Sequence, residues 1–259
     1  HQLPSTITVM PTPFTHLAIA QRLLHDTAIP HAYRDLLATH RAAFQLGSIV
    51  ADARVSSGVG REVTPFYKYD VPMIEHPWRV MLAEHPTLQT SQNEVHRVFL
   101  AGYVAHLCTD EAWALKVVRP HFWKREWDGV DLPDKFFALH LILTHMDERD
   151  EKLLETWQPE TLPRCAPHDW LPFMPDDVLC GWRDLIANQI SPDGISQTLA
   201  IFGKRLHLEP PKIRETLDDA DTMHHRLWQH VPLSLLEAAE TQIYAFTRDQ
   251  LCVYLTEYI

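Results

Sequence analysis

The chain has 259 residues, of which 46% are hydrophobic and 22% are charged, and its formal net charge is −11 at pH 7. A chain of this length and composition can bury a full core, so we expect an ordered globular protein. The acidic balance repels phosphate backbones and anionic lipids, which argues against a nucleic-acid-binding patch and against a membrane-surface protein. An anionic substrate would therefore need local compensation, for example from a bound cation.

The four cysteines are widely spaced and form no CxxC pair, which argues against a zinc ribbon and a disulfide scaffold. We expect reduced, mostly buried thiols. No apolar run reaches the roughly 18 residues that span a bilayer, and the first residues lack the features of a signal peptide. We therefore expect a cytoplasmic protein with no transmembrane segment. The chain is typical of one whose native start is Met10, with a leader before it.

Helical periodicity with almost no strand-like alternation predicts an all-α fold, a multi-helix bundle of at least six helices. The prolines, 19 in all, lie between the apolar segments and punctuate them. In chain order, the predicted helices cover residues 17–24, 33–46, 90–118, 134–157, 176–190, 195–205, 211–230 and 233–258.

Two stretches interrupt this pattern. Residues 47–69 are rich in small side chains and are predicted to form a functional loop, which carries Asp52 and Glu62. The proline-rich residues 159–175 form the boundary between a helical core, residues 1–158, and a C-terminal part, residues 159–259. We expect these additional C-terminal helices to pack on the same domain as the core.

The acidic run Asp147, Glu148, Asp150 and Glu151 is predicted to be a solvated helix end.

His106 and Asp110 are the first candidate metal ligands. Their i, i+4 spacing on a strongly helical segment places both side chains on one face, about one turn apart. A simple hydrogen bond on the helix surface would have the same spacing. The apolar surroundings favour a site, because charged groups in such a setting need a partner or a cation.

His16 and Asp52 are further candidates from earlier in the chain. His16 is predicted to lie at a helix start, where Thr15 can cap the helix, and so to be held rigidly. Asp52 is a lone carboxylate that follows an apolar stretch, and a buried carboxylate needs a positive partner.

The order of these residues and their surroundings resemble the zinc-dependent phospholipase C family, whose scaffold the related single-strand nucleases share. The matching stretches are PFTHLAIAQRLL around His16, LGSIVADAR around Asp52, TPFY at residues 64–67, and FLAGYVAHLCTDEAW around His106 and Asp110. The resemblance covers roughly the first 120 residues. It implies an all-helical bundle in which His and Asp residues hold zinc, and a metal-bound hydroxide that attacks the phosphorus of a phosphodiester.

The sequence also departs from the family pattern. Pro65 and Lys116 occupy positions where the family usually supplies histidine ligands, so a three-metal cluster is not expected and one or two zinc ions, or none, remain. His140 is a possible substitute ligand on an apolar helix, although it could equally be a core residue. His76, His121 and His145 are weaker candidates.

Two functions follow from this degenerate active site. The first is a metal-dependent phosphoester hydrolase, acting on a phosphoester or lipid-like small molecule, with a metal-polarised water as nucleophile and Glu62 or Glu111 as base. The second is a non-catalytic helical binding or assembly protein that has lost the full metal cluster. Turnover of a generic phosphodiester with added zinc separates the two.

Overall fold

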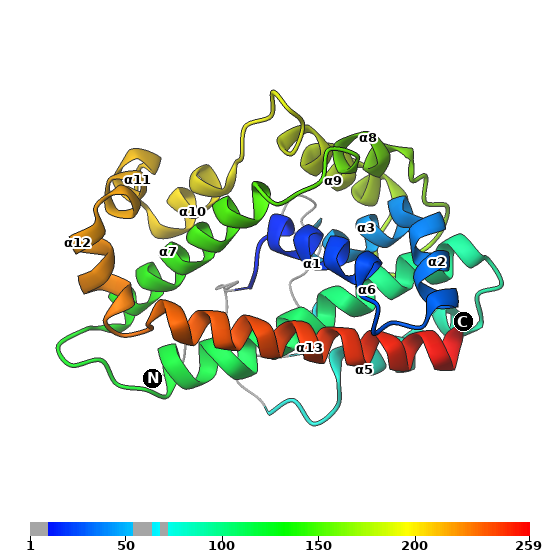
Figure 1. Ribbon diagram of the computed structural model, residues 1–259, viewed down its shortest axis with the longest axis horizontal. Helices are drawn as coiled ribbons and strands as arrows, with labels where there is room; N and C mark the ends of the chain where they lie inside the picture. Colours follow the sequence, from blue (N-terminus) through cyan, green and yellow to red (C-terminus); the bar gives the residue numbers. More distant parts are fainter. Residues whose placement is uncertain (1–9, 54–63, 68–71) are drawn as a thin grey trace.

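The computed structural model describes residues 10–53, 64–67 and 72–259, and these form helices joined by turns (Figure 1). Within these ranges there is no β-strand, only an isolated bridge between Leu171 and Met174. The predicted all-α class is thereby confirmed, while its phospholipase C type stays a prediction. The α-helices are α1 (Pro13–His25), α2 (His31–Thr39), α3 (Arg41–Val50), α5 (Pro77–Glu84), α6 (Glu94–Trp113), α7 (Leu132–Glu151), α8 (Gln158–Thr161), α9 (Asp176–Gln189), α10 (Thr198–Leu206), α11 (Pro210–Asp218), α12 (Ala220–Met223) and α13 (Leu233–Tyr258).

Short 3-10 and π segments extend or link several of these helices. They are the 3-10 turns η1 (Ala51–Ala53), η2 (Pro86–Thr90) and η4 (Leu162–Arg164), and the π-helices η3 (Ala114–Trp123) and η5 (His224–Trp228). The predicted helix over residues 211–230 is divided into α11, α12 and η5, and α5 was not predicted at all. By contrast, α13 has the predicted bounds.

The prediction of a loop over residues 47–69 is wrong for its first residues, 47–53, which are helical. The predicted helix over residues 33–46 is two helices, α2 and α3, and α3 continues through Gly47 to Val50 before the turn η1. Asp52 therefore lies on a buried 3-10 turn that extends a helix. Gly47, one of the small residues that suggested a loop, instead allows close helix packing.

Helix α6 is central because α3, α5 and α13 all pack against it (Figure 1). The contact between α3 and α6 is made by backbone: a Cβ added to Gly47 would lie 1.9 Å from the Phe99 carbonyl oxygen, and one added to Gly102 would lie 2.1 Å from that of Phe44. Only glycine fits at such distances. The two glycines thus allow the main chains of α3 and α6 to approach each other closely.

The apolar core has two parts. One surrounds α3 and α6, and the other lies between α7, η3 and the helices from α10 to η5. Figure 1 shows α7 with α10, α11 and α12 at one end of the molecule and α2 at the other. Helix α13 runs along the molecule and contributes to both parts.

Within the described ranges, none of the helices combines the length and apolar character that crossing a bilayer requires. All four cysteines are free thiols, as predicted: Cys108 and Cys165 are buried and Cys180 and Cys252 are partly buried.

Candidate metal centre

His106 is held in one orientation by the main chain of the neighbouring helix. Its Nδ1 lies 2.8 Å from the carbonyl oxygen of Ser48 on α3. Because a carbonyl oxygen only accepts hydrogen bonds, Nδ1 carries the proton and donates it. The other ring nitrogen, Nε2, is thereby directed at Asp110, and it lies 3.3 Å from Asp110 Oδ2. The predicted i, i+4 pair therefore exists, inside the protein and not on a helix surface.

His16 of α1 completes a three-residue cluster with this pair. Its Nε2 lies 3.3 Å from Asp110 Oδ1, and its ring is stacked on that of His106 with the ring centroids 3.8 Å apart. All three side chains are buried, and their ligand atoms lie within 4.8 Å of one another. We call His16, His106 and Asp110 the metal cluster.

Two atoms of the metal cluster lack a hydrogen-bond partner. His16 Nε2 and Asp110 Oδ1 are buried and face each other at 3.3 Å, but neither makes a well-formed hydrogen bond among the residues that the structure describes. An unpaired polar atom in the interior costs roughly 1–3 kcal/mol of stability, and the two lie next to each other. A cation between the three side chains would satisfy both atoms at once.

The electrostatics of the metal cluster favour a positive charge at its centre. Burial opposes the charge on His106, but the Asp110 carboxylate and then Asp52 outweigh this effect and raise the pKa of His106 to about 9. Burial likewise opposes the charge on Asp110, yet the two histidines outweigh it and lower the pKa of that carboxyl group. Burial and the neighbouring His106 lower the pKa of His16. In the metal-free protein one proton on His106 would supply the positive charge, and a metal ion can replace that proton.

The spacing of the donor atoms fits a small divalent ion. Zinc lies about 2.0 Å from histidine nitrogens and about 2.0–2.2 Å from carboxylate oxygens, so two ligands at a tetrahedral angle are roughly 3.3 Å apart. Each histidine Nε2 lies 3.3 Å from one oxygen of Asp110, His16 from Oδ1 and His106 from Oδ2, and one ligand atom from each residue lies within 4.8 Å of the others. This set of nitrogen and oxygen donors suits zinc and other imidazole-binding ions, so the group can hold a metal ion of a type still to be determined.

Asp52 lies beside the metal cluster but is not one of its three members. It is buried, and its negative charge adds to the rise in the pKa of His106 and opposes the fall in the pKa of His16. Pro65, in the described segment 64–67, offers no ligand atom, and Lys116 is half-exposed on the π-helix η3.

The other predicted site residues lie elsewhere or are not described. His140, on α7, belongs to the second core: its Nδ1 donates to the Phe136 carbonyl oxygen at 2.8 Å, and its ring packs edge-on against Phe202. Glu111 is hydrogen bonded to His76 at 2.9 Å and is not a member of the metal cluster. Glu62 lies outside the described residues.

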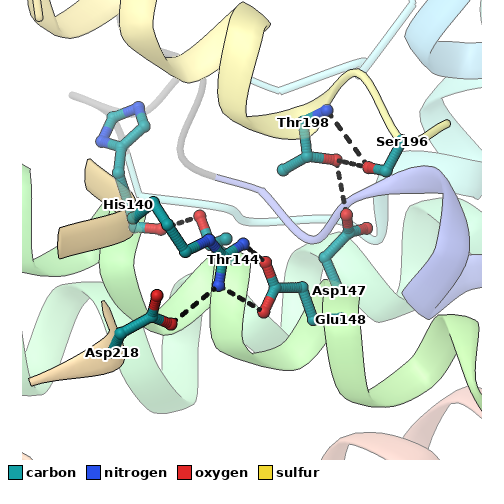
Figure 2. A network of polar contacts seen from close by, with 8 residues as sticks. His140, Thr144, Asp147, Glu148, Ser196, Thr198 and Asp218 are labelled. Atoms are coloured by element: carbon teal, nitrogen blue, oxygen red, sulfur yellow. Dashed lines mark hydrogen bonds and ion pairs between the residues drawn. The ribbon is translucent and has the colours of Figure 1, made fainter. Parts of the chain in front are cut away.

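Asp147 and Asp150 were missed by the sequence reasoning, which placed them on a solvated helix end. Both are buried, and they bind hydroxyl groups at the start of α1: Thr12 donates to Asp147, and Thr15 donates to Asp150 at 2.8 Å. Figure 2 shows that Asp147 also accepts a hydrogen bond from Thr198 of α10. These contacts tie α1, which carries His16, to α7. The sequence signal was the spacing of 147 and 150, which puts both side chains on one face.

No protein-family model, curated protein or solved structure matches this chain. The resemblance to zinc-dependent phospholipases C therefore rests on the motifs in the sequence.

Proposed function

We propose that this protein is a metal-dependent phosphoester hydrolase whose ion is held by His16, His106 and Asp110. The observation that carries the proposal is the pair of unsatisfied buried atoms, His16 Nε2 and Asp110 Oδ1, in a cluster with the spacing of metal ligands. The motif resemblance supports the reaction class. The proposal keeps three of the five side chains that the sequence suggested as ligands, and it leaves out Asp52 and His140.

A bound divalent ion would supply Lewis acidity, polarising a phosphoryl oxygen and lowering the pKa of a bound water towards about 7. His106 and His16 provide neutral nitrogens, and Asp110 provides one negative charge. With three protein ligands, a tetrahedral shell has one position left for water or substrate, as catalytic sites require.

Asp52 has a separate part in this proposal. Asp52 lines a cavity and acts electrostatically on both His16 and His106, so its carboxylate can accept a proton from a water molecule in that cavity. Glu111, the base suggested by the sequence, is hydrogen bonded to His76 and is less well placed. Asp52 is therefore the carboxylate that we propose as the general base.

The test has two stages. Protein purified without chelator is first analysed for metal content, and protein reloaded with zinc or manganese is then assayed on p-nitrophenyl phosphate and bis-p-nitrophenyl phosphate. We expect one ion per chain and hydrolysis that chelation abolishes. Retention of metal with no turnover of either ester would instead support the non-catalytic binding protein. Absence of any bound metal would overturn the metal site itself, whether catalytic or not.

A further inference from the structure

Two threonines at the start of α1 use their hydroxyl groups to attach this helix to α7. Thr12, the residue before the helix, makes no side-chain hydrogen bond to the helix start, although threonine at this position usually caps the first turn. Its hydroxyl donates instead to Asp147. Thr15, which the sequence suggested as the cap, lies inside the helix and donates to Asp150 at 2.8 Å. Both bonds therefore fix the position of α1.

This attachment lies directly beside a member of the metal cluster. Thr15 is the residue before His16, and the His16 amide donates to the Thr12 carbonyl oxygen at 3.2 Å. Among the described residues, His16 Nε2 faces Asp110 at 3.3 Å but makes no well-formed hydrogen bond. The ring of His106, by contrast, is held by a main-chain carbonyl oxygen. The position of the His16 ring thus depends on where α1 is held.

Asp150 connects the start of α1 to a third helix. Its Oδ2 accepts the hydrogen bond from Thr15, and its Oδ1 accepts one from Arg149 Nε at 2.8 Å. Arg149 in turn donates two hydrogen bonds to Glu240 of α13, at 2.9 and 2.6 Å. Since both oxygens of the buried Asp150 carboxylate are bonded and its charge is paired, this carboxylate is a fixed anchor.

Helix α13 also contacts the helix that carries the rest of the metal cluster. It packs along α6, which bears His106 and Asp110 (Figure 1). The hydroxyl groups of Thr247 on α13 and Thr109 on α6 are buried and lie 3.2 Å apart. Thr109 is the residue before Asp110. A path of hydrogen bonds along α7 and α13 therefore joins the neighbour of His16 to the neighbour of Asp110.

We propose that Thr15 and Asp150 are positioning residues of the metal centre, which hold His16 at the distance from Asp110 that a bound ion requires. This inference rests on the proposed function, because it concerns the same ion. The ligands of a metal site have to be held within about 0.5 Å of their working geometry by the surrounding contacts. Asp150 does this through the main chain of α1, because it bonds the residue next to the ligand and not the ligand itself.

The experiment compares zinc affinity with stability in the full chain. Thr15→Val removes the hydroxyl group but keeps the branched shape, whereas Thr15→Ser keeps the hydroxyl group. Thr198→Val is the matched control, because it removes the same kind of bond to a buried carboxylate of α7 from α10, which carries no member of the metal cluster. Each chelator-treated protein is titrated with zinc by calorimetry and unfolded in urea. The absorption spectrum of bound cobalt records the coordination geometry.

We expect Thr15→Val to bind zinc about tenfold more weakly than wild type and to change the cobalt spectrum, since loss of an outer-shell partner costs about 10- to 100-fold in metal affinity. Thr15→Ser should restore zinc binding to within about twofold of wild type. Thr198→Val should also bind zinc within about twofold of wild type, although its free energy of unfolding falls. Metal affinity and stability would then respond to different residues.

Equal zinc affinity in wild type and a folded Thr15→Val variant would overturn this inference and leave the proposed metal site standing. A loss of affinity in Thr198→Val as large as in Thr15→Val would also overturn it, because metal binding would then follow stability alone. If Thr15→Val does not fold, Arg149→Gln replaces it, since 37% of the Arg149 side chain is exposed. We expect about threefold weaker zinc binding there, and an unchanged affinity would again overturn the inference.

Two further outcomes separate this inference from the proposed function. Absence of zinc binding by the wild-type protein would overturn both. A loss of zinc affinity confined to Thr15→Val, in a protein that hydrolyses no phosphoester, would support the positioning role and count against the hydrolase.

Discussion

Asp110 on α6 and Asp147 on α7 are both buried carboxylates, with 3% and 1% of their surfaces exposed, but their surroundings are opposite. Each oxygen of Asp147 accepts a hydrogen bond from a threonine hydroxyl. Each oxygen of Asp110 instead faces a histidine nitrogen at 3.3 Å, and Oδ1 is unpaired among the described residues.

The pKa shifts follow these surroundings. Burial dominates at Asp147 and raises the pKa of its carboxyl group to about 7, although Thr12 and Thr198 act in the other direction. At Asp110 the two histidines outweigh burial, and the pKa is lowered. The hydrogen-bonding capacity of Asp147 is therefore satisfied by protein groups on both oxygens. The metal cluster, by contrast, favours a positive charge between its side chains. Asp147 is thus a carboxylate that joins neighbouring helices, whereas Asp110 belongs to a group that could hold a metal ion.

The largest expected effect tests which histidine belongs to the site. His106→Ala should weaken metal binding by more than about a hundredfold, because loss of even an outer-shell partner costs about 10- to 100-fold. His140→Ala is the matched control, since His140 is equally buried on another helix. We expect His140→Ala to lower stability but to retain the ion. Elemental analysis of the folded fraction checks both, and metal loss in the control alone would reverse the assignment.

The next effect concerns the helix crossing that holds His106. Gly47→Ala would bring a Cβ within 1.9 Å of the Phe99 carbonyl oxygen, so α3 and α6 must separate. We expect a loss of about 4 kcal/mol in the free energy of unfolding, or failure to fold. Gly181→Ala on α9 meets nothing within 4 Å and should stabilise the protein by about 0.5–1 kcal/mol. Urea unfolding of both variants measures the contrast, and equal stabilities would contradict the close crossing.

Asp147 should give the protein a characteristic pH dependence. Because its pKa is raised from 3.8 in the unfolded chain to about 7, the folded state binds the proton more tightly. The resulting stabilisation is full below about pH 4 and is lost as the pH rises through about 7, by about 4 kcal/mol in total. Asp147→Asn carries no titrating proton and should remove this component. Urea unfolding of chelator-treated protein between pH 4 and 8 tests it; parallel profiles for wild type and variant would exclude the effect.

The smallest expected effect on stability comes from removing one of the two hydroxyl groups that donate hydrogen bonds to Asp147. Thr198→Val removes a hydrogen bond to Asp147 while keeping the side chain's shape, and should cost about 1 kcal/mol at pH 8. Thr241→Val is the control, because the Thr241 hydroxyl bonds the Glu237 carbonyl oxygen on an exposed helix surface. The free energies of unfolding should differ between the two variants. An unchanged free energy of unfolding in Thr198→Val would mean that this hydrogen bond to Asp147 does not stabilise the protein.

Part of this arrangement could be predicted from the sequence, for physical reasons. The long helices α7 and α13 have strong periodicity and clear proline boundaries, and the pair His106 and Asp110 follows from helical spacing alone. The place of His16 came from a resemblance of motifs, not from spacing, since partners far apart in sequence leave no periodic signal.

The remainder depends on tertiary contacts. The break at His40, between α2 and α3, lies in a stretch with continuous helical character, so local pattern does not reveal it. Asp147 and Asp150 resemble solvated charges because their threonine partners are about 135 residues away. Likewise, small residues such as Gly47 indicate a loop and a tight helix crossing equally well.

The hydrogen bond from His106 to Ser48 has a consequence for how the site tolerates mutation. The acceptor is a main-chain carbonyl oxygen, so it is present whatever side chain stands at position 48. Many metal sites orient a histidine with a carboxylate side chain, which a single substitution removes. Here the orientation of the His106 ring depends on the position of the α3 main chain. The residue most sensitive to substitution is therefore the neighbouring Gly47, which allows α3 to pack closely against α6. Ser48→Ala should therefore leave the hydrogen bond to His106 in place, whereas a side chain added at position 47 would disturb it, although only residue 48 contacts His106.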